Sequence, residues 1–269
     1  MDYNSVQQAR KIIQKSTDII ILAGAGMSAD LGTPTYYTGD MSKYGSNTSQ
    51  YGYTAYEHAW APLWLEARET QMKYYRETWA KLLGTQTRTE SSPYVSLINY
   101  LTSTGKGYFV STTNVDSAFA RTDFDPQRVH EIHGAHRFSQ CLDNPDHGVY
   151  PTVDPNESFT RCLSCGGDSR PNVMYFLDFD FNGEIVSAQN ERYHEYLDTL
   201  DPKTTAVLEI GVGETVKTLR YAARRLSAVY RFPIIRINPD KDPGDIIPNV
   251  ESHLIMNASA GLSALLANQ

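Results

Sequence analysis

A short apolar run that ends in Gly-x-Gly, Ile19 to Ser28, constrains the fold of this chain most strongly. A strand of a parallel sheet is covered on both faces and therefore reads as continuous apolar, often β-branched residues. Glycines after such a strand leave room for an anion to approach backbone N–H groups, and a helix should follow with its positive end towards a phosphate. The segment predicts a buried strand and a nucleotide-binding turn, although ordinary strand ends show the same pattern.

Short β-rich runs recur along the chain and alternate with helical patterns. Helical spacing over residues 6–13 precedes the first run. The later runs are 107–112, 205–210, 232–237 and 253–256, with helices expected over 215–229 and 258–267. This alternation predicts an α/β fold with a doubly wound, Rossmann-like parallel sheet, which binds ligands beyond the carboxyl ends of its strands.

Two segments interrupt the alternation. Residues 35–90 are rich in Tyr and Trp and contain a helical pattern over 61–83, which would form either one wall of a cleft or a plain helical subdomain. Residues 136–181 hold all three cysteines among many Asp, Asn, Pro and Gly residues, as in a small loop-rich module that needs a staple. The large sheet domain would then comprise residues 1–34, 91–135 and 182–269.

Composition excludes several classes of protein. A net charge of −7 and a pI near 5.5 argue against nucleic-acid or membrane-surface binding and leave basic peptides as allowed partners. No apolar run approaches the roughly 20 residues that span a bilayer, and the first residues lack the features of a signal peptide, so a cytoplasmic location is expected. The Cys162-x-x-Cys165 pair favours reduced thiols or a metal site over disulfides.

Polar side chains follow the run 107–112. An amide at Asn114 and a carboxylate at Asp116 could bind a carboxamide or a ribose at the sheet edge. Asx residues also cap helices very often, so either side chain could simply cap a helix over 117–121. Both readings stay open from this segment alone.

Three more strand ends carry polar residues or glycines. His133 ends a brief strand over 129–132, and a histidine near its ordinary pKa of about 6.5 can take a proton from a sugar hydroxyl. Gly211 to Gly213 could form a second nucleotide-contacting turn or an ordinary turn. Asn238 ends another strand and could bind a ribose hydroxyl.

The order of these motifs is informative. From the N-terminus they are Gly24-Ala25-Gly26-Met27-Ser28, Gly32-Thr33-Pro34, Thr112-Thr113-Asn114-Val115-Asp116, His133-Gly134, Cys162-x-x-Cys165 and Asn238. In this order, and over nearly the whole chain, they resemble the motifs of the sirtuin family. The segment from Arg170 to Phe176 is similar to the substrate-binding segment of that family.

The resemblance implies an NAD-dependent protein lysine deacylase that transfers the acyl group to ADP-ribose and releases nicotinamide. NAD and an acyl-lysine peptide would meet in a cleft between the Rossmann-like domain and a zinc-ribbon-like module. His133 would be the general base, with Asn114 and Asp116 positioning NAD. The cofactor-binding residues would be Gly24, Ala25, Gly26, Ser28, Thr33, Pro34, Tyr36, Thr113, Asn114, Asp116, Gly211, Val212, Gly213 and Asn238, and the substrate-binding residues Val173, Tyr175 and Phe176.

Departures from the family pattern leave the reaction open. After Gly32-Thr33-Pro34 the family usually has Asp-Phe-Arg, whereas this chain has Thr35-Tyr36-Tyr37 and so lacks a carboxylate and a guanidinium near the reacting ribose. Thr113 and the Gly211 to Gly213 turn are similar to a microbial branch of protein ADP-ribosyltransferases, which lacks the His-Gly present here. The alternatives are therefore an ADP-ribosyltransferase or NAD glycohydrolase on the same scaffold, and a non-catalytic NAD or ADP-ribose sensor. His133 favours deacylation.

The expected zinc site has three cysteines and needs a fourth ligand. Cys141, Cys162 and Cys165 supply thiolates, but Asn144 stands where a second Cys-x-x-Cys pair would end. The sequence leaves Asp143, Asp146, His136 and His147 as candidates for the fourth position, or a module that has lost its metal.

Overall fold

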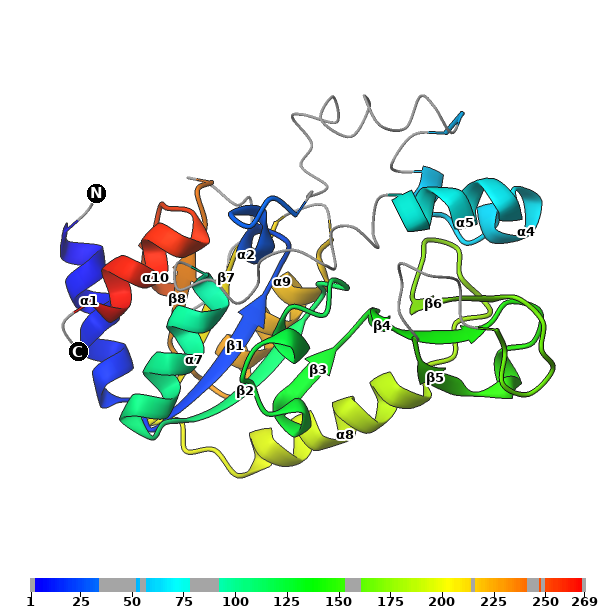
Figure 1. Ribbon diagram of the computed structural model, residues 1–269. Coiled ribbons are helices and arrows are strands. Elements are labelled where there is room, and N and C mark those ends of the chain that lie inside the picture. The colour runs from blue at the N-terminus through cyan, green and yellow to red at the C-terminus, as the bar shows by residue number, and fades with distance from the viewer. Residues whose placement is uncertain are drawn as a thin grey trace.

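Six parallel strands form the central sheet of the computed structural model, which describes residues 3–33, 52–53, 57–77, 92–152, 161–213, 216–240, 247 and 250–267 (Figure 1). The strands are β1 (Asp18–Ala23), β2 (Gly107–Thr112), β3 (Val129–Glu131), β7 (Thr205–Ile210), β8 (Ile234–Ile237) and β9 (Val250–Leu254). Their spatial order, β3-β2-β1-β7-β8-β9, reverses direction between β1 and β7. The expected doubly wound α/β fold is confirmed, and the reversal marks where such a sheet binds ligands.

Helices cover both faces of this sheet. Helices α1 (Tyr3–Lys15), α7 (Pro93–Thr104) and α10 (Ala258–Leu266) pack on one face, where Ile19 and Ile21 point, and α8 (Glu184–Asp198) and α9 (Thr218–Ala228) pack on the other, where Ile20 and Leu22 point. Burial on both faces explains the unbroken apolar run of β1. Short turns complete this part: α2 (Gly26–Ala29), η3 (Phe119–Arg121) and η4 (Pro126–Arg128).

A second, smaller sheet lies at the far end of the molecule, beyond β3 (Figure 1). It is antiparallel, with the order β5 (Val149–Pro151), β4 (Gly134–Cys141) and β6 (Ser169–Val173), and η5 (Pro145–His147) joins β4 to β5. Helices α4 (Leu63–Glu66) and α5 (Arg68–Glu77), after η2 (Glu57–Ala59), pack on it through Trp64, Tyr75 and Leu142. Arg68 also forms ion pairs with Asp143 at 2.6 Å and Asp168 at 3.1 Å.

Several expected helices differ from the structure. The helix expected over 61–83 is divided into α4 and α5 by Ala67, whose φ of −135° and ψ of 45° are not helical, and residues 78–83 lie outside the described residues. The expected helix over 117–121 is the single 3₁₀ turn η3. Helices α7 and α8 were not predicted. Among the described helices, none has the length and apolar character needed to cross a membrane.

Candidate functional site

The glycine turn after β1 packs directly against the turn after β7. The N–H of Gly24 donates to the carbonyl of Ile210, and that of Gly26 to the carbonyl of Gly211, each at 2.9 Å. A Cβ atom on Gly24 would lie 2.5 Å from the Gly211 carbonyl oxygen. These glycines are therefore required for the close approach of two backbones, and their N–H groups are already engaged. Within residues 24–28, Ala25 has the one N–H with no hydrogen-bond partner among the described residues.

Asn114 and Asp116 lie beside this turn, after β2. The Asn114 side chain donates from Nδ2 to the Gly24 carbonyl at 3.0 Å. The Asp116 carboxylate accepts from Ser28 Oγ at 2.5 Å and from the N–H of Ala118 at 2.9 Å. Asp116 thus holds the backbone just before η3 and connects it to Ser28, whereas the N-cap residue of η3 is Ala118, without a side-chain cap.

His133 lies where the central sheet passes into the small sheet, between β3 and β4. Its side chain is half-buried on the wall of a cavity, and its backbone carbonyl accepts from the N–H of Met174 at 2.9 Å. Burial lowers the pKa of the imidazole, so the neutral form dominates near pH 7. No described residue forms a hydrogen bond with this imidazole. His133 can therefore accept a proton from a molecule bound in the cavity.

The turn after β7 is held by buried polar side chains. The carbonyl of Val212 accepts from Asn238 Nδ2 and from Arg220 Nη2, both at 2.7 Å. Arg220 and Arg236 both bind the buried carboxylate of Glu209, at 2.9 and 2.6 Å. Asn238 also accepts from the N–H of Asp240 at 2.9 Å, so both ends of its amide are engaged within the protein. Asn238 thus lines the cavity and supports the turn at 211–213 through its hydrogen bond to Val212.

The segment after β6 connects the cavity to the helices of the small sheet. The N–H of Phe176 donates to the Ala59 carbonyl at 2.9 Å, and the N–H of Ala61 donates to the Phe176 carbonyl at 3.0 Å. The buried ion pair between Arg170 on β6 and Asp178, 2.7 Å long, joins the two ends of this segment. Leu177 has a φ of 58°, a left-handed conformation that costs energy for a residue with a side chain and is concentrated at functional sites.

One cavity of about 470 Å³ unites these groups. It lies at the carboxyl ends of β1, β2, β3, β7 and β8, at the point where the strand order reverses, and extends to the small sheet. Of the residues expected to bind cofactor or substrate or to act in catalysis, it is lined by Gly24, Ala25, Gly26, Ser28, Thr33, Thr113, Asn114, Asp116, His133, Val173, Tyr175, Phe176, Gly211, Val212, Gly213 and Asn238. The other two, Pro34 and Tyr36, lie outside the described residues.

Further residues that line the cavity include His58 and Tyr74, which were not predicted individually, and His136, which was expected only as a possible zinc ligand. His58 stacks on Tyr74, with ring centroids 3.6 Å apart, and its Nδ1 lies 2.5 Å from Gln71 Oε1. Buried His136 approaches from β4, and burial, reinforced by Arg121, lowers its pKa to about 3. Burial also lowers the pKa of His58. This end of the cavity therefore has neutral imidazoles, and residues 57–77 contribute to a cleft wall, one of the two roles expected for the insert.

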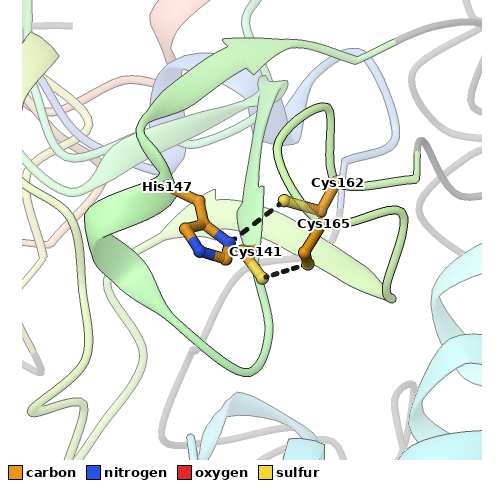
Figure 2. A group of neighbouring side chains, drawn as sticks. All are labelled: Cys141, His147, Cys162 and Cys165. Carbon is orange, nitrogen blue, oxygen red and sulfur yellow. Dashed lines mark hydrogen bonds between the residues drawn. The ribbon is translucent and has the colours of Figure 1, made fainter.

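The three cysteines meet a histidine in the small sheet. Figure 2 shows Cys141, His147, Cys162 and Cys165 converging, and their ligand atoms all lie within 4.8 Å of one another. Cys141 Sγ is 3.8 Å from Cys165 Sγ, and Cys162 Sγ is 3.4 Å from His147 Nδ1. Tetrahedral zinc with ordinary bond lengths needs S···S and S···N separations of ~3.8 and ~3.6 Å. The cluster fits structural zinc, with His147 in the position that the sequence left open.

The other candidates for the fourth ligand do not belong to the cluster. Asp143 pairs with Arg68, and His136 faces the cavity. Asp146 is absent from the cluster, although its N–H donates to Asn144 Oδ1 at 2.9 Å. Asn144, expected as a gap in the ligand pattern, also lies 3.3 Å from the outer imidazole nitrogen of His147 and so helps to orient the ring.

Residues 24–216 match the family model named Sir2 family. The chain belongs to this family. The match includes the glycine turn, the ends of β2, β3 and β7 that line the cavity, and the complete cysteine and histidine cluster. The resemblance to sirtuins that the order of the motifs indicated is confirmed.

Individual Sir2 relatives match over most of the chain. An NAD-dependent protein deacylase of Deinococcus radiodurans is 25% identical, over 97% of this chain and 98% of its own. A protein ADP-ribosyltransferase of Staphylococcus aureus strain Mu50 is 26% identical, over 77% of this chain and 68% of its own. A solved complex of a Sir2 homolog with NAD has a TM-score of 0.72 at 22% identity, covering 99% of this chain and 93% of that one.

Proposed function

We propose that this chain is an NAD-dependent protein lysine deacylase. The observation that carries the proposal is the cavity at the switch point of the sheet, which brings a glycine turn, an amide and a histidine neutral near pH 7 together with the segment 173–176. NAD supplies an activated ribose from which nicotinamide can leave, and the acyl-lysine supplies the acyl group. The deacylase of Deinococcus radiodurans, which matches almost end to end, supports the same activity.

The residues divide this work by their place in the cavity. The turns at 24–26 and 211–213 form the floor where the two halves of the sheet meet, and we assign the pyrophosphate and adenosine to them. Asn114 and Asp116 lie beside the turn at 24–28, on the side of β2, and we assign the nicotinamide ribose to them. His133 lines the same cavity and lies next to the segment 173–176, since its carbonyl accepts from the N–H of Met174. In this position the imidazole would take a proton from a ribose hydroxyl.

Product identification tests this proposal. The protein is incubated with NAD, with and without an acyl-lysine peptide, and the nucleotide products are separated by mass. Deacylation predicts O-acyl-ADP-ribose and free nicotinamide in amounts that depend on the acylated peptide. Free ADP-ribose without peptide would indicate glycohydrolase activity, and bound but unchanged NAD would indicate a sensor.

A protein ADP-ribosyltransferase is the second candidate. The Staphylococcus aureus relative carries that name, and Thr113 and the turn at 211–213 are similar to such a branch. This activity predicts ADP-ribose attached to protein instead of O-acyl-ADP-ribose. The presence of His133 on the cavity wall favours deacylation over this alternative, because transfer to a protein nucleophile does not need a base that activates the ribose hydroxyl.

Zinc at Cys141, His147, Cys162 and Cys165 belongs to the same proposal as a structural ion. It would fix the loops of the small sheet, from which His136 and the segment 173–176 reach the cavity. We also propose an acyl-lysine protein or peptide as the partner, and a cytoplasmic location with neither nucleic acid nor membrane as a partner.

A further inference from the structure

A hydrogen-bonded series of buried side chains lies behind the cavity wall at Asn114. Ser28 Oγ is 2.6 Å from Tyr94 Oη and 2.5 Å from Asp116 Oδ2. Tyr94 lies near the start of α7 and its side chain is fully buried, with its ring edge-to-face against Phe119 at 4.8 Å. Tyr94 itself does not line the cavity, whereas Ser28, Asn114 and Asp116 do. Any effect of Tyr94 on a bound molecule must therefore pass through these neighbours.

The direction of each hydrogen bond follows from the groups involved. A carboxylate oxygen accepts, so the one proton of Ser28 is donated to Asp116. Tyr94 must then donate its own proton to Ser28 Oγ. Burial, together with the charge of Asp116, raises the pKa of Tyr94 well above its usual range, so the phenol keeps this proton across the physiological pH range.

The same neighbours set the orientation of the Asn114 amide. The Gly24 carbonyl can only accept, so the amide end that lies 3.0 Å from it is the nitrogen. That nitrogen is also 3.4 Å from both Ser28 Oγ and Tyr94 Oη. With Nδ2 directed to these three oxygens, the amide oxygen is the polar atom that Asn114 can offer to the cavity.

We propose that Tyr94 is a positioning residue of the nucleotide site. It holds Ser28 and the Asn114 amide so that the Asn114 oxygen accepts a hydrogen bond from a hydroxyl group on the second ribose of a bound dinucleotide. The inference rests on the proposed function, because it takes NAD as the molecule bound there. It goes beyond the predicted site residues, none of which lies on α7.

Binding of ADP and ADP-ribose to Tyr94→Phe tests this role. The two ligands differ by the second ribose, so the ratio of their dissociation constants, measured by calorimetry, reports on the Asn114 end of the cavity within one protein sample. The wild type should bind ADP-ribose more tightly than ADP. Tyr94→Phe should reduce this preference by about tenfold, the effect of a lost buried hydrogen bond, and leave ADP affinity unchanged.

Tyr108→Phe is the matched control. Tyr108 is also a buried tyrosine whose hydroxyl forms one hydrogen bond, accepting from the N–H of Asp125 at 2.9 Å, but it does not line the cavity or touch Asn114. This variant should keep the wild-type preference for ADP-ribose. A full preference in Tyr94→Phe, or an equal loss in both variants, overturns the inference.

Ser28→Ala interrupts the same series of hydrogen bonds and leaves the aromatic ring of Tyr94 in the core. It therefore tests the inference even if Tyr94→Phe does not fold. It should lose the preference as Tyr94→Phe does, and in the double variant the two losses should not add. Additive losses, or a full preference in Ser28→Ala, contradict the role of Tyr94. A wild type that binds neither ADP nor ADP-ribose would instead remove the proposed function itself.

Discussion

The central sheet and the small antiparallel sheet are stabilised in different ways. Every residue of β7 is buried, and two apolar clusters cover the faces of the central sheet. The described apolar cluster of the small sheet contains three buried residues, Trp64, Tyr75 and Leu142. The small sheet has in addition the Cys₃His cluster and the ion pairs of Arg68.

This difference has a consequence for the cavity, which both sheets line. Fully burying a large apolar side chain contributes about 1.5–3 kcal/mol, so the central sheet is stable through many such residues. A module with few buried apolar side chains needs an additional cross-link, and a bound metal ion supplies one. The floor of the cavity should therefore persist under conditions that disorder the wall formed by the small sheet.

The largest expected effect is that of metal removal. Chelation, or the substitution Cys165→Ser, should abolish zinc binding and unfold the small sheet, because apparent zinc-binding energies in structural sites reach about 10 kcal/mol and couple directly to folding. Metal analysis of protein purified without chelator measures the binding. Hydrogen exchange should show lost protection in β4 and β6, with β1 and β7 still protected.

Ser164→Ala provides the control for this prediction. Ser164 lies between the two cysteines and its hydroxyl donates to the His147 carbonyl at 3.3 Å, but it offers no metal ligand. The variant should keep zinc and the protection of β4. Equal absence of metal from the wild type and Cys165→Ser would contradict the zinc assignment, and loss of protection in both sheets together would contradict their separate stabilisation.

Substitution of His133 tests the chemistry at the place where the two sheets meet. His133→Ala should reduce NAD-dependent deacylation by about 10²- to 10⁴-fold, the usual contribution of a positioned general base, while ADP-ribose binding changes little. His194→Ala is the control, because His194 is a half-buried histidine on α8 that does not line the cavity. Turnover of His133→Ala at the wild-type rate would remove the base assignment.

Substitutions of two glycines compare a position where two backbones pack closely with a turn position that has free space around it. Gly24→Ala would force a Cβ to within 2.5 Å of the Gly211 carbonyl oxygen, and overpacking of this kind costs about 1–3 kcal/mol. Gly213→Ala meets no atom within 4 Å and should change stability by less than about 0.5 kcal/mol. Urea unfolding of both variants measures the difference. Equal stabilities would show that the β1 and β7 turns can move apart at little cost.

Much of the central sheet could be predicted because each of its strands has a recognisable pattern within its own sequence. The run Ile19 to Ala23 and the run 107–112 are buried on both faces, so each is apolar and β-rich by itself, and both match strands of the structure. Parallel strands place their carboxyl ends at one edge, which is why Asn114, His133 and Asn238 could be expected to line one cavity. Helix α8 was missed, since its buried face has only Gln189, Tyr193 and Leu197.

The parts that could not be predicted depend on contacts between distant segments. His147 follows Cys141 by six residues and belongs to no Cys-x-x-Cys pair, so only the fold of β4 and η5 selects it from the four candidates. Tyr94 reaches Ser28 from a helix 66 residues away in sequence. His58 and Tyr74 line the cavity because α5 packs on the small sheet. No local sequence pattern predicts this packing.

The smallest expected effect concerns the acid stability of the central sheet through His130 on β3. Burial, together with the nearby His194, His133 and Arg192, lowers the pKa of His130 to about 4. The unfolded chain, with a histidine pKa near 6.5, binds more protons between these values, so stability is complete above pH ~6.5 and falls as the pH decreases. At about 1.4 kcal/mol per pH unit, the loss between pH 6.5 and 5 is about 2 kcal/mol. His130→Gln should therefore lose about 2 kcal/mol less than the wild type between pH 7 and 5 in urea unfolding. Parallel losses in the two proteins would mean that His130 becomes protonated in the folded sheet and that the acid sensitivity lies elsewhere.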